Sequence, residues 1–339
     1  MNAQTPVTTL FLALSRADDV LSRLEGRLTG HPLQKLWEQR TDCLEAHAGA
    51  WNRGELAPLE DVVLHDASMD RSLPTIGVTL AQAILRGRRR TFRTAPARLL
   101  TPSGLEILLA RTGASTENDT DLAEKAKSHM EEVAINFDGR MVAYPIPGSL
   151  NRNDPSELFS YWLRASRDLQ QSHPAVLAVA MLLDLWWRLE PSQSQDYAGA
   201  LLLEAYCRLG GRVRHARLCL EMGARAVNAH PSQWRRDAPD ARRIQVCLDI
   251  VRSGAQKGLD EFNRLVLAAQ ILQRTLADRR TTSKLPELVD LALRSPLITT
   301  DLVSRSLRVT PQAAGRLIDE LGGSLVEITG RARYRAWRI

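Results

Sequence analysis

The chain has 339 residues, which is enough for two or three domains that each bury a core. Its 44% apolar and 25% charged residues are ordinary for a soluble globular protein. The net charge of +6 is uneven: residues 279–339 hold eleven Lys and Arg against six Asp and Glu, while the preceding 278 residues hold 34 against 33. A basic end indicates binding to nucleic acid or another acidic surface, although a basic segment that only keeps the chain soluble is the alternative.

Several site classes are disfavoured by simple patterns. The four cysteines lie far apart without a C-x-x-C pair, so reduced thiols in helices are expected rather than zinc or disulfides. No basic segment precedes the apolar residues 10–14, which argues against a signal peptide, and the apolar stretch 175–183 is too short to span a bilayer. We therefore expect a cytoplasmic protein that makes no membrane contact and needs no cofactor.

Helical periodicity dominates the first part of the chain. Predicted helices cover residues 20–28, 33–44, 46–56 and 80–90, and another opens at Pro58 with acids in its first turn. Residues 111–121 are polar and rich in Gly, Ser, Asn and Asp, which indicates a loop. Three prolines and a glycine within residues 144–155 then indicate a boundary.

Strong helical patterns follow at residues 156–170, 174–189, 197–209, 241–253 and 259–278. These patterns predict four segments: an N-terminal helical region (1–110), a loop-rich linker (111–155), a central helical domain (156–280) and a C-terminal module (285–339). The predicted fold class is mainly α.

The C-terminal module predicts a helix-turn-helix. An amphipathic helix at 285–293 ends at Ser295 and Pro296. Thr300 is expected to cap a short helix at 301–307, and a tight turn at 308–309 follows. Thr310 and Pro311 begin the next helix, which runs to Leu321 with a cap and an N1 proline.

A hairpin completes this module. Gly322 and Gly323 end the second helix, residues 325–328 and 334–338 alternate as strands, and residues 329–331 form the turn between them. Helices followed by such a wing predict a winged helix-turn-helix.

In this arrangement Gln312, Arg316 and Asp319 lie on the solvent face of the second helix, where Gln and Arg can bond base edges in the major groove. Arginines 331, 333 and 335 suit phosphates or a minor groove. The candidate DNA-binding residues are Thr300, Thr310, Gln312, Arg316, Arg331, Arg333 and Arg335. A winged helix used only for protein contacts, with solvated arginines, is the alternative.

Residues 285–321 and 327–337 resemble the winged helix that closes many Fic-type, adenylyl-transferring proteins, and residues 45–67 resemble their N-terminal helix pair. As a whole, the chain is similar to an alphaproteobacterial (rhizobial), often plasmid-borne family with a central domain of unknown function and a C-terminal helix-turn-helix DNA-binding domain. This resemblance implies a helical Fic-like bundle followed by a DNA-binding module.

The catalytic loop departs from the Fic pattern H-P-F-x-x-G-N-G-R. In the equivalent stretch only Pro191 is retained: Glu190 stands in the position of the base, Gln195 and Tyr197 replace glycines, and Ala198 replaces the arginine. Side chains at these glycine positions prevent close backbone approach to phosphate. We therefore expect a degenerate scaffold that is not an enzyme.

Other candidate sites have plainer explanations. His65, Asp66 and Asp70 suggest a metal or acid-base group but also fit a helix terminus with solvated acids. His215, Cys219 and His230 lack recognisable zinc spacing. Trp186 and Trp187 suit helix packing better than a ligand pocket. The basic run 86–93 fits a helix end better than a second phosphate contact, and Arg235, Arg236, Arg242 and Arg243 can form one solvated face.

These patterns together predict a sequence-specific transcriptional regulator that binds double-stranded DNA as a homodimer, because two half-sites multiply the limited affinity of one short helix. The rival hypotheses are a nucleotidyl- or phosphoryl-transferring enzyme regulated by its winged helix, and a protein-binding adaptor.

Overall fold

The computed structural model describes residues 6–70, 73–109, 143–192, 195–230, 234–277, 284–330 and 335–339. Its helices are α1 (Pro6–Leu28), α2 (Gln34–Asn52), α3 (Leu59–Asp66), α4 (Ile76–Arg93), α5 (Pro96–Leu99), α6 (Gly104–Leu109), α7 (Pro155–Ser172), α8 (Ala175–Leu189), α9 (Ala198–Leu209), α10 (Leu220–Ala226), α11 (Asp240–Ala277), α12 (Leu285–Arg294), α13 (Thr300–Leu307), α14 (Pro311–Leu321) and the short 3-10 helix η2 (Gly322–Ser324). The strands are β1 (Ile298–Thr299), β2 (Val326–Glu327) and β3 (Ala336–Arg338). The predicted fold class, mainly α with a C-terminal helix-turn-helix, is confirmed.

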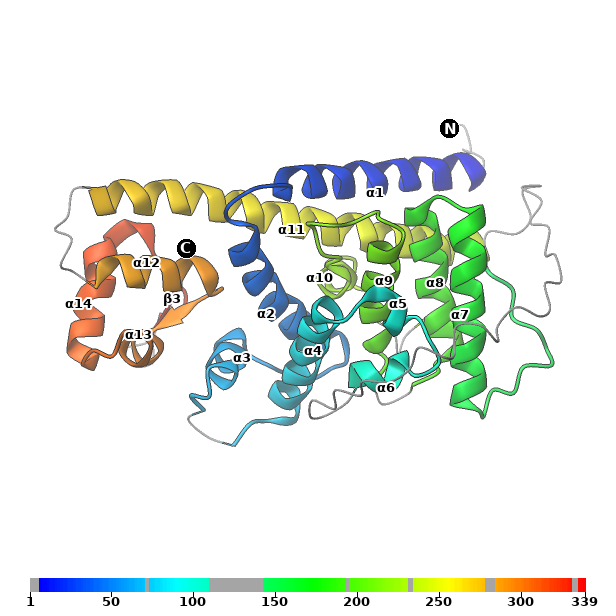
Figure 1. The fold of residues 1–339 in the computed structure, drawn as a ribbon, viewed down its shortest axis with the longest axis horizontal. Helices are drawn as coiled ribbons and strands as arrows, with labels where there is room; N and C mark the ends of the chain where they lie inside the picture. Colours follow the sequence, from blue (N-terminus) through cyan, green and yellow to red (C-terminus); the bar gives the residue numbers. More distant parts are fainter. Residues whose placement is uncertain are drawn as a thin grey trace.

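The long helix α11 forms the spine of the molecule (Figure 1). Its first part lies alongside α1, and α8 and α10 also pack against it. Its last part extends beyond the end of α1 and lies over α12 of the winged helix. We call residues 6–277 the body and residues 284–339 the winged helix.

The helix α11 is continuous where the sequence predicts two helices, at 241–253 and 259–278. Gly254 and Gly258 separate the two predicted patterns, yet both lie inside the helix. A Cβ atom on Gly254 would lie 2.2 Å from the carbonyl oxygen of Cys219, so the glycine lets the segment leading into α10 touch the α11 backbone. Gly223 on α10 makes a similar approach to the Ile250 carbonyl oxygen. These glycines therefore serve helix packing, at a modest cost in helix propensity.

The N-terminal helices also differ in detail from the prediction. The predicted helix at 46–56 is the end of α2, which stops at Asn52 before Gly54 adopts a positive φ of 78°. The helices α2 and α4 pack on α10 and α9 of the later segment, so the N-terminal and central regions share one core. The predicted linker at 111–155 lies largely outside the described residues, and the division into domains stays a prediction.

Tryptophans pack the far end of the body, as the sequence predicts. Trp186 is 1% exposed, and its indole N–H donates to the Asp196 carbonyl oxygen at 2.9 Å. Its ring meets that of Trp162 edge-on, with centroids 5.6 Å apart. Trp187 meets the ring of Trp234 in the same way. In the part of the chain that the structure describes, no helix is long and apolar enough to cross a membrane.

Candidate nucleic-acid interface

The C-terminal residues form a winged helix built on a three-stranded sheet. The strand order is β1-β3-β2 with both pairs antiparallel: Ile298 faces Trp337 across one pair, and Val326 faces Arg338 across the other. The two strands of the predicted hairpin therefore pair, although they are shorter than the sequence indicates, and residues 331–334 of the hairpin lie outside the described residues. The third strand, β1, was not predicted, because a buried two-residue strand beside Pro296 carries no alternating pattern.

The cap of α13 is one residue earlier than predicted. Thr299, not Thr300, is the N-cap, and its hydroxyl accepts the backbone N–H of Leu302 at 3.1 Å. Thr300 is instead the first residue of the helix. Two adjacent threonines leave the choice of cap open in a sequence, and the buried pairing of Thr299 in β1 decides it.

The start of α14 is as predicted. Thr310 is its N-cap and accepts the backbone N–H of Ala313 at 3.2 Å, and Pro311 occupies the first turn. The preceding turn places Arg308 in the left-handed region with φ of 56°. Ser304 closes this turn twice: its carbonyl accepts the Val309 N–H at 2.9 Å, and its hydroxyl donates to the Val309 carbonyl at 2.7 Å. Both α14 and its approach are thus fixed by local hydrogen bonds.

The helix α14 has one buried and one exposed face. Ala314 and Ile318 are 0% and 3% exposed and pack toward α12 and α13. Gln312, Arg316 and Asp319 are exposed on the other side, as expected. The side chains offered to a ligand therefore include an amide, a guanidinium and a carboxylate.

Two further arginines lie next to this face. Arg305, in the last turn of α13, and Arg308, in the turn, are both exposed. Among the described residues, neither of them nor Arg316 has an ion-pair or side-chain hydrogen-bond partner. Sequence reasoning missed Arg305 and Arg308 because it assigned them to helix and turn formation. Their place just before a capped helix is the signal that could have identified them.

The wing arginines divide into two groups. Arg331 and Arg333 lie outside the described residues. The Arg335 guanidinium donates to Glu327 with its Nε 2.8 Å from Oε2, and lies 5.0 Å from the ring centre of Trp337. This hydrogen bond raises the pKa of Arg335 and lowers that of Glu327. Arg335 therefore braces the wing, while its side chain stays 46% exposed.

A buried arginine of the body holds the winged helix in place. Arg40 of α2 is 0% exposed, and its Nη1 donates to the carbonyl oxygens of Ala292 at 3.0 Å, Leu293 at 3.4 Å and Ser295. These carbonyls end α12, where backbone acceptors lack helical partners. The cation thus caps the first helix of the winged helix from the side of the body.

Glu261 of α11 connects this arginine to the sheet. It accepts Arg40 Nε at 2.6 Å through Oε1 and Arg338 Nη2 of β3 at 3.0 Å through Oε2, and it also pairs with Arg264. Glu261 is 3% exposed. Burial is the main cause that lowers the pKa of Arg40, and Glu261 opposes it. One carboxylate therefore links α2, α11 and β3.

Three arginines of the basic run 86–93 are engaged in bonds within the body. Arg88 is 3% exposed and donates to Asp42 at 3.1 Å and Glu45 at 3.2 Å. Arg89 forms two bonds to the Asp66 carboxylate, and Arg90 donates to backbone carbonyls of α6. The second predicted basic face is also divided, because Arg243 is buried and bonded to Asp184 at 2.9 Å.

Several described residues of the stretch compared with the Fic loop contact other parts of the body. Glu190 has a positive φ of 51° and forms an ion pair with Arg236. Asp196 pairs with Arg53, and Tyr197 and Ala198 are 5% and 0% exposed. His65 bonds Asp70 at 2.7 Å. Within the described residues, no three His, Cys, Asp or Glu side chains are grouped to hold a metal ion.

Comparison with known proteins agrees with this geometry. Residues 285–339 match the family described as an HTH DNA binding domain, and residues 152–277 match a protein family of unknown function, DUF1612. The chain is 31% identical to the uncharacterized protein y4cF of Sinorhizobium fredii, over 99% of this chain and 98% of that protein. The chain belongs to the y4cF family. In this chain the matched helix-turn-helix DNA-binding domain spans α12 to β3.

Proposed function

We propose that this protein is a sequence-specific DNA-binding transcriptional regulator whose helix α14 reads double-stranded DNA in the major groove. The observation that carries the proposal is the exposed face of α14. It presents Gln312 and Arg316 from a helix whose first turn is already fixed by Thr310. A pre-ordered reader loses less conformational entropy on binding.

Arg316 and Gln312 have the chemistry that base reading needs. A guanidinium can donate two hydrogen bonds to guanine O6 and N7, and a side-chain amide can bond adenine N6 and N7. Asp319, on the same face, repels phosphates and so disfavours binding at random sequence. The face therefore attracts particular bases and disfavours positions on the duplex in which Asp319 lies close to a phosphate.

Phosphate contacts flank this reader in our proposal. Arg305 and Arg308 precede α14, and their exposed guanidiniums have no carboxylate partner in the described residues. Arg331 and Arg333, predicted for the wing, extend the contact on the other side, and Arg335 adds its exposed part while bracing Glu327. Such contacts position the protein and carry little sequence information.

We further propose that the protein acts as a cytoplasmic homodimer on two half-sites. One short helix buries little DNA surface, and a second copy multiplies the affinity.

In this proposal the body is a Fic-like helical scaffold without transferase activity. The position of Asp196 supports it, because Arg53 pairs with this carboxylate in a largely buried contact, and Tyr197 and Ala198 beside it are buried. The rival is an active nucleotidyl-transferring enzyme regulated by the winged helix. Incubation with labelled ATP and candidate target proteins separates the two: covalent labelling lost in Glu190→Ala would favour the enzyme.

A binding selection on randomised duplexes tests the reader directly. The wild type is expected to enrich one motif, and Arg316→Ala is expected to lose one base position at a cost of about 1–3 kcal/mol on the preferred site. Arg167→Ala is the matched control, because Arg167 is an exposed arginine on α7, far from the winged helix (Figure 1). Equal enrichment of the same motif by the wild type and Arg316→Ala would show that α14 does not read the DNA sequence.

A further inference from the structure

The junction between α3 and α4 carries an apolar surface. Leu73 is 91% exposed, Ile76 76% and Leu56 70%, which are the highest values among the large apolar side chains of the described residues. Pro58 and Pro74 are exposed beside them. We call these five residues the Leu73 patch. The Leu56 carbonyl oxygen lies against Gly77, the residue after Ile76, so these exposed side chains come from neighbouring backbone. Exposed apolar side chains that gather in one place can mark an interaction site.

Local contacts hold the Leu56 side of the Leu73 patch against the start of α4. Gly77 lies so close to the preceding loop that a Cβ atom there would be 2.2 Å from the Leu56 carbonyl oxygen. Thr75 caps α4 by accepting the Val78 N–H, and the Ala57 carbonyl lies 2.7 Å from His47 Nδ1. The first turn of α4 is therefore held against the loop around Leu56. A partner that binds this part of the surface loses little conformational entropy in ordering it.

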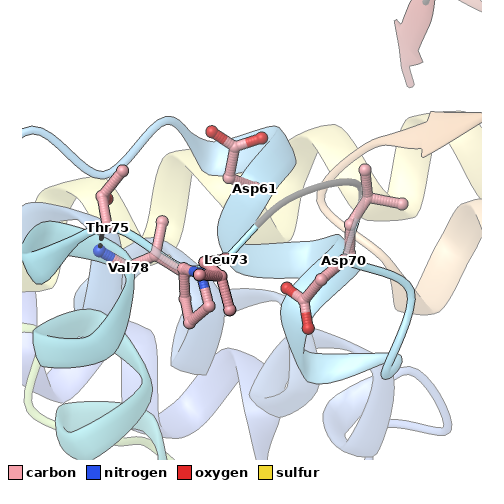
Figure 2. A pocket seen from close by; sticks show the side chains of 7 residues that line it. Asp61, Asp70, Leu73, Thr75 and Val78 are labelled. Atoms are coloured by element: carbon pink, nitrogen blue, oxygen red, sulfur yellow. Dashed lines mark hydrogen bonds between the residues drawn. The ribbon is translucent and has the colours of Figure 1, made fainter.

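Carboxylates lie at the edge of this surface (Figure 2). Asp61 and Asp70 line a shallow cavity together with Leu73 and Pro74. Its volume of about 50 Å³ is far below that of small-molecule sites, which are about 300–1,000 Å³. Asp61 is exposed and has no ion-pair partner among the described residues, whereas Asp70 bonds His65. The cavity thus suits a side chain of a macromolecule rather than a metabolite.

We propose that the Leu73 patch docks a basic amphipathic helix of another protein. Apolar side chains at three- and four-residue spacing would cover Leu56, Leu73 and Ile76, and flanking lysines or arginines would meet Asp61 and Asp70. The same carboxylates disfavour the other occupants. DNA and anionic lipid are repelled, and two copies of the patch brought together would place like charges face to face.

No residue of the patch belongs to the winged helix, and the peptide used as a probe and a DNA duplex are different ligands. Docking and DNA binding can therefore be measured independently, and the inference does not depend on the proposed function.

Fluorescence anisotropy on the full chain tests the proposal with a labelled helical peptide of Leu on one face and Lys on the other. The wild type is expected to bind this peptide, and Leu73→Ser/Ile76→Ser to bind it about tenfold more weakly. Asp61→Asn is expected to weaken binding severalfold and to reduce its salt dependence. Leu267→Ser/Ile271→Ser is the matched control, since it removes exposed apolar side chains from α11 instead.

Three outcomes would overturn the proposal. They are equal peptide binding by the wild type and Leu73→Ser/Ile76→Ser, equal binding of a Leu and Glu peptide, and a wild-type dimer in light scattering that Leu73→Ser/Ile76→Ser converts to a monomer. The last outcome would assign the patch to a second copy of this chain. All four substituted side chains are exposed, so unchanged thermal melting is expected to show that the variants fold.

Discussion

One group of arginines in the body and one in the winged helix have opposite surroundings. In the body, Arg40 and Arg88 are buried and surrounded by carboxylates and carbonyls. In the winged helix, Arg305, Arg308 and Arg316 are exposed and have no such partners in the described residues. The comparison teaches that a basic run in a sequence does not identify a nucleic-acid surface. What matters is whether nearby acidic residues already neutralise it.

The largest expected effect comes from removing a buried arginine. Arg40→Met is expected to lower the free energy of unfolding by about 3–5 kcal/mol, because Glu261 and the carbonyls that end α12 lose their donor. Urea denaturation followed by circular dichroism measures it. Arg316→Met is the control and should change stability by less than about 0.5 kcal/mol. Similar losses of unfolding free energy in both variants would contradict the proposed difference between the buried arginine of the body and the exposed arginine of the winged helix.

A pH series probes the carboxylates that face the buried arginines. Burial is the main cause that raises the pKa of Glu45 to about 7, although Arg88 opposes it. A carboxyl whose pKa is higher in the folded state keeps its proton longer there, so its stabilising contribution is complete below about pH 4.5 and is lost as the pH rises through 7. As the pH rises from 5 to 8, we expect deprotonation of Glu45 to lower the free energy of unfolding by about 2 kcal/mol.

Glu45→Gln is the variant that isolates this contribution. Its unfolding free energy should change less between pH 5 and 8 than that of the wild type, and Glu327→Gln in the exposed wing should leave the wild-type pH dependence unchanged over that window. Parallel curves for the wild type and Glu45→Gln would assign the pH dependence to other groups, among them Glu204, whose pKa burial also raises to about 7.

The exposed arginines are tested by salt dependence. Arg305→Gln and Arg308→Asn are each expected to weaken binding to all duplexes alike and to reduce the slope of log K against log salt by about one unit. Asn is chosen for position 308 because it tolerates the left-handed backbone found there. An unchanged slope for both variants would mean that these arginines remain solvated when DNA binds.

The smallest effect concerns the caps inside the winged helix. Thr310→Ala should lower the unfolding free energy by about 1 kcal/mol because the Ala313 N–H loses its acceptor. Thr300→Ala should leave it within a few tenths of a kcal/mol of the wild type or slightly higher, since Thr300 lies within the first turn, is not the N-cap, and alanine is the better helix former. Equal losses would contradict the assignment of the cap to Thr299.

Local patterns in the sequence predicted the winged helix well. The cap at Thr310, the proline after it and the exposed face around Arg316 all follow from hydrogen bonding and periodicity within a few residues. The shift from Thr300 to Thr299 and the strand β1 depend on pairing with β3, which lies almost forty residues further along the chain. Local sequence patterns do not predict a contact between segments so far apart in the chain.

The body shows the same limit more strongly. A glycine in a helical pattern predicts a break, yet Gly254 continues α11 because another segment approaches its backbone. Likewise, the burial of Arg88 depends on Asp42 and Glu45, more than forty residues earlier. The Leu73 patch was not predicted. The exposure of Leu73 and Ile76 depends on whether distant segments of the chain pack over them, which a local pattern does not show.

The continuous α11 also bears on how the molecule melts. A helix of 38 residues is about 57 Å long, and here it contributes buried side chains to the body and, through Glu261, an anchor for β3. Because neither region keeps its packing when this helix frays, we expect heat to unfold both in a single cooperative transition. Calorimetric and van 't Hoff enthalpies should then agree, which is unusual for a chain of this length with a DNA-binding module at one end.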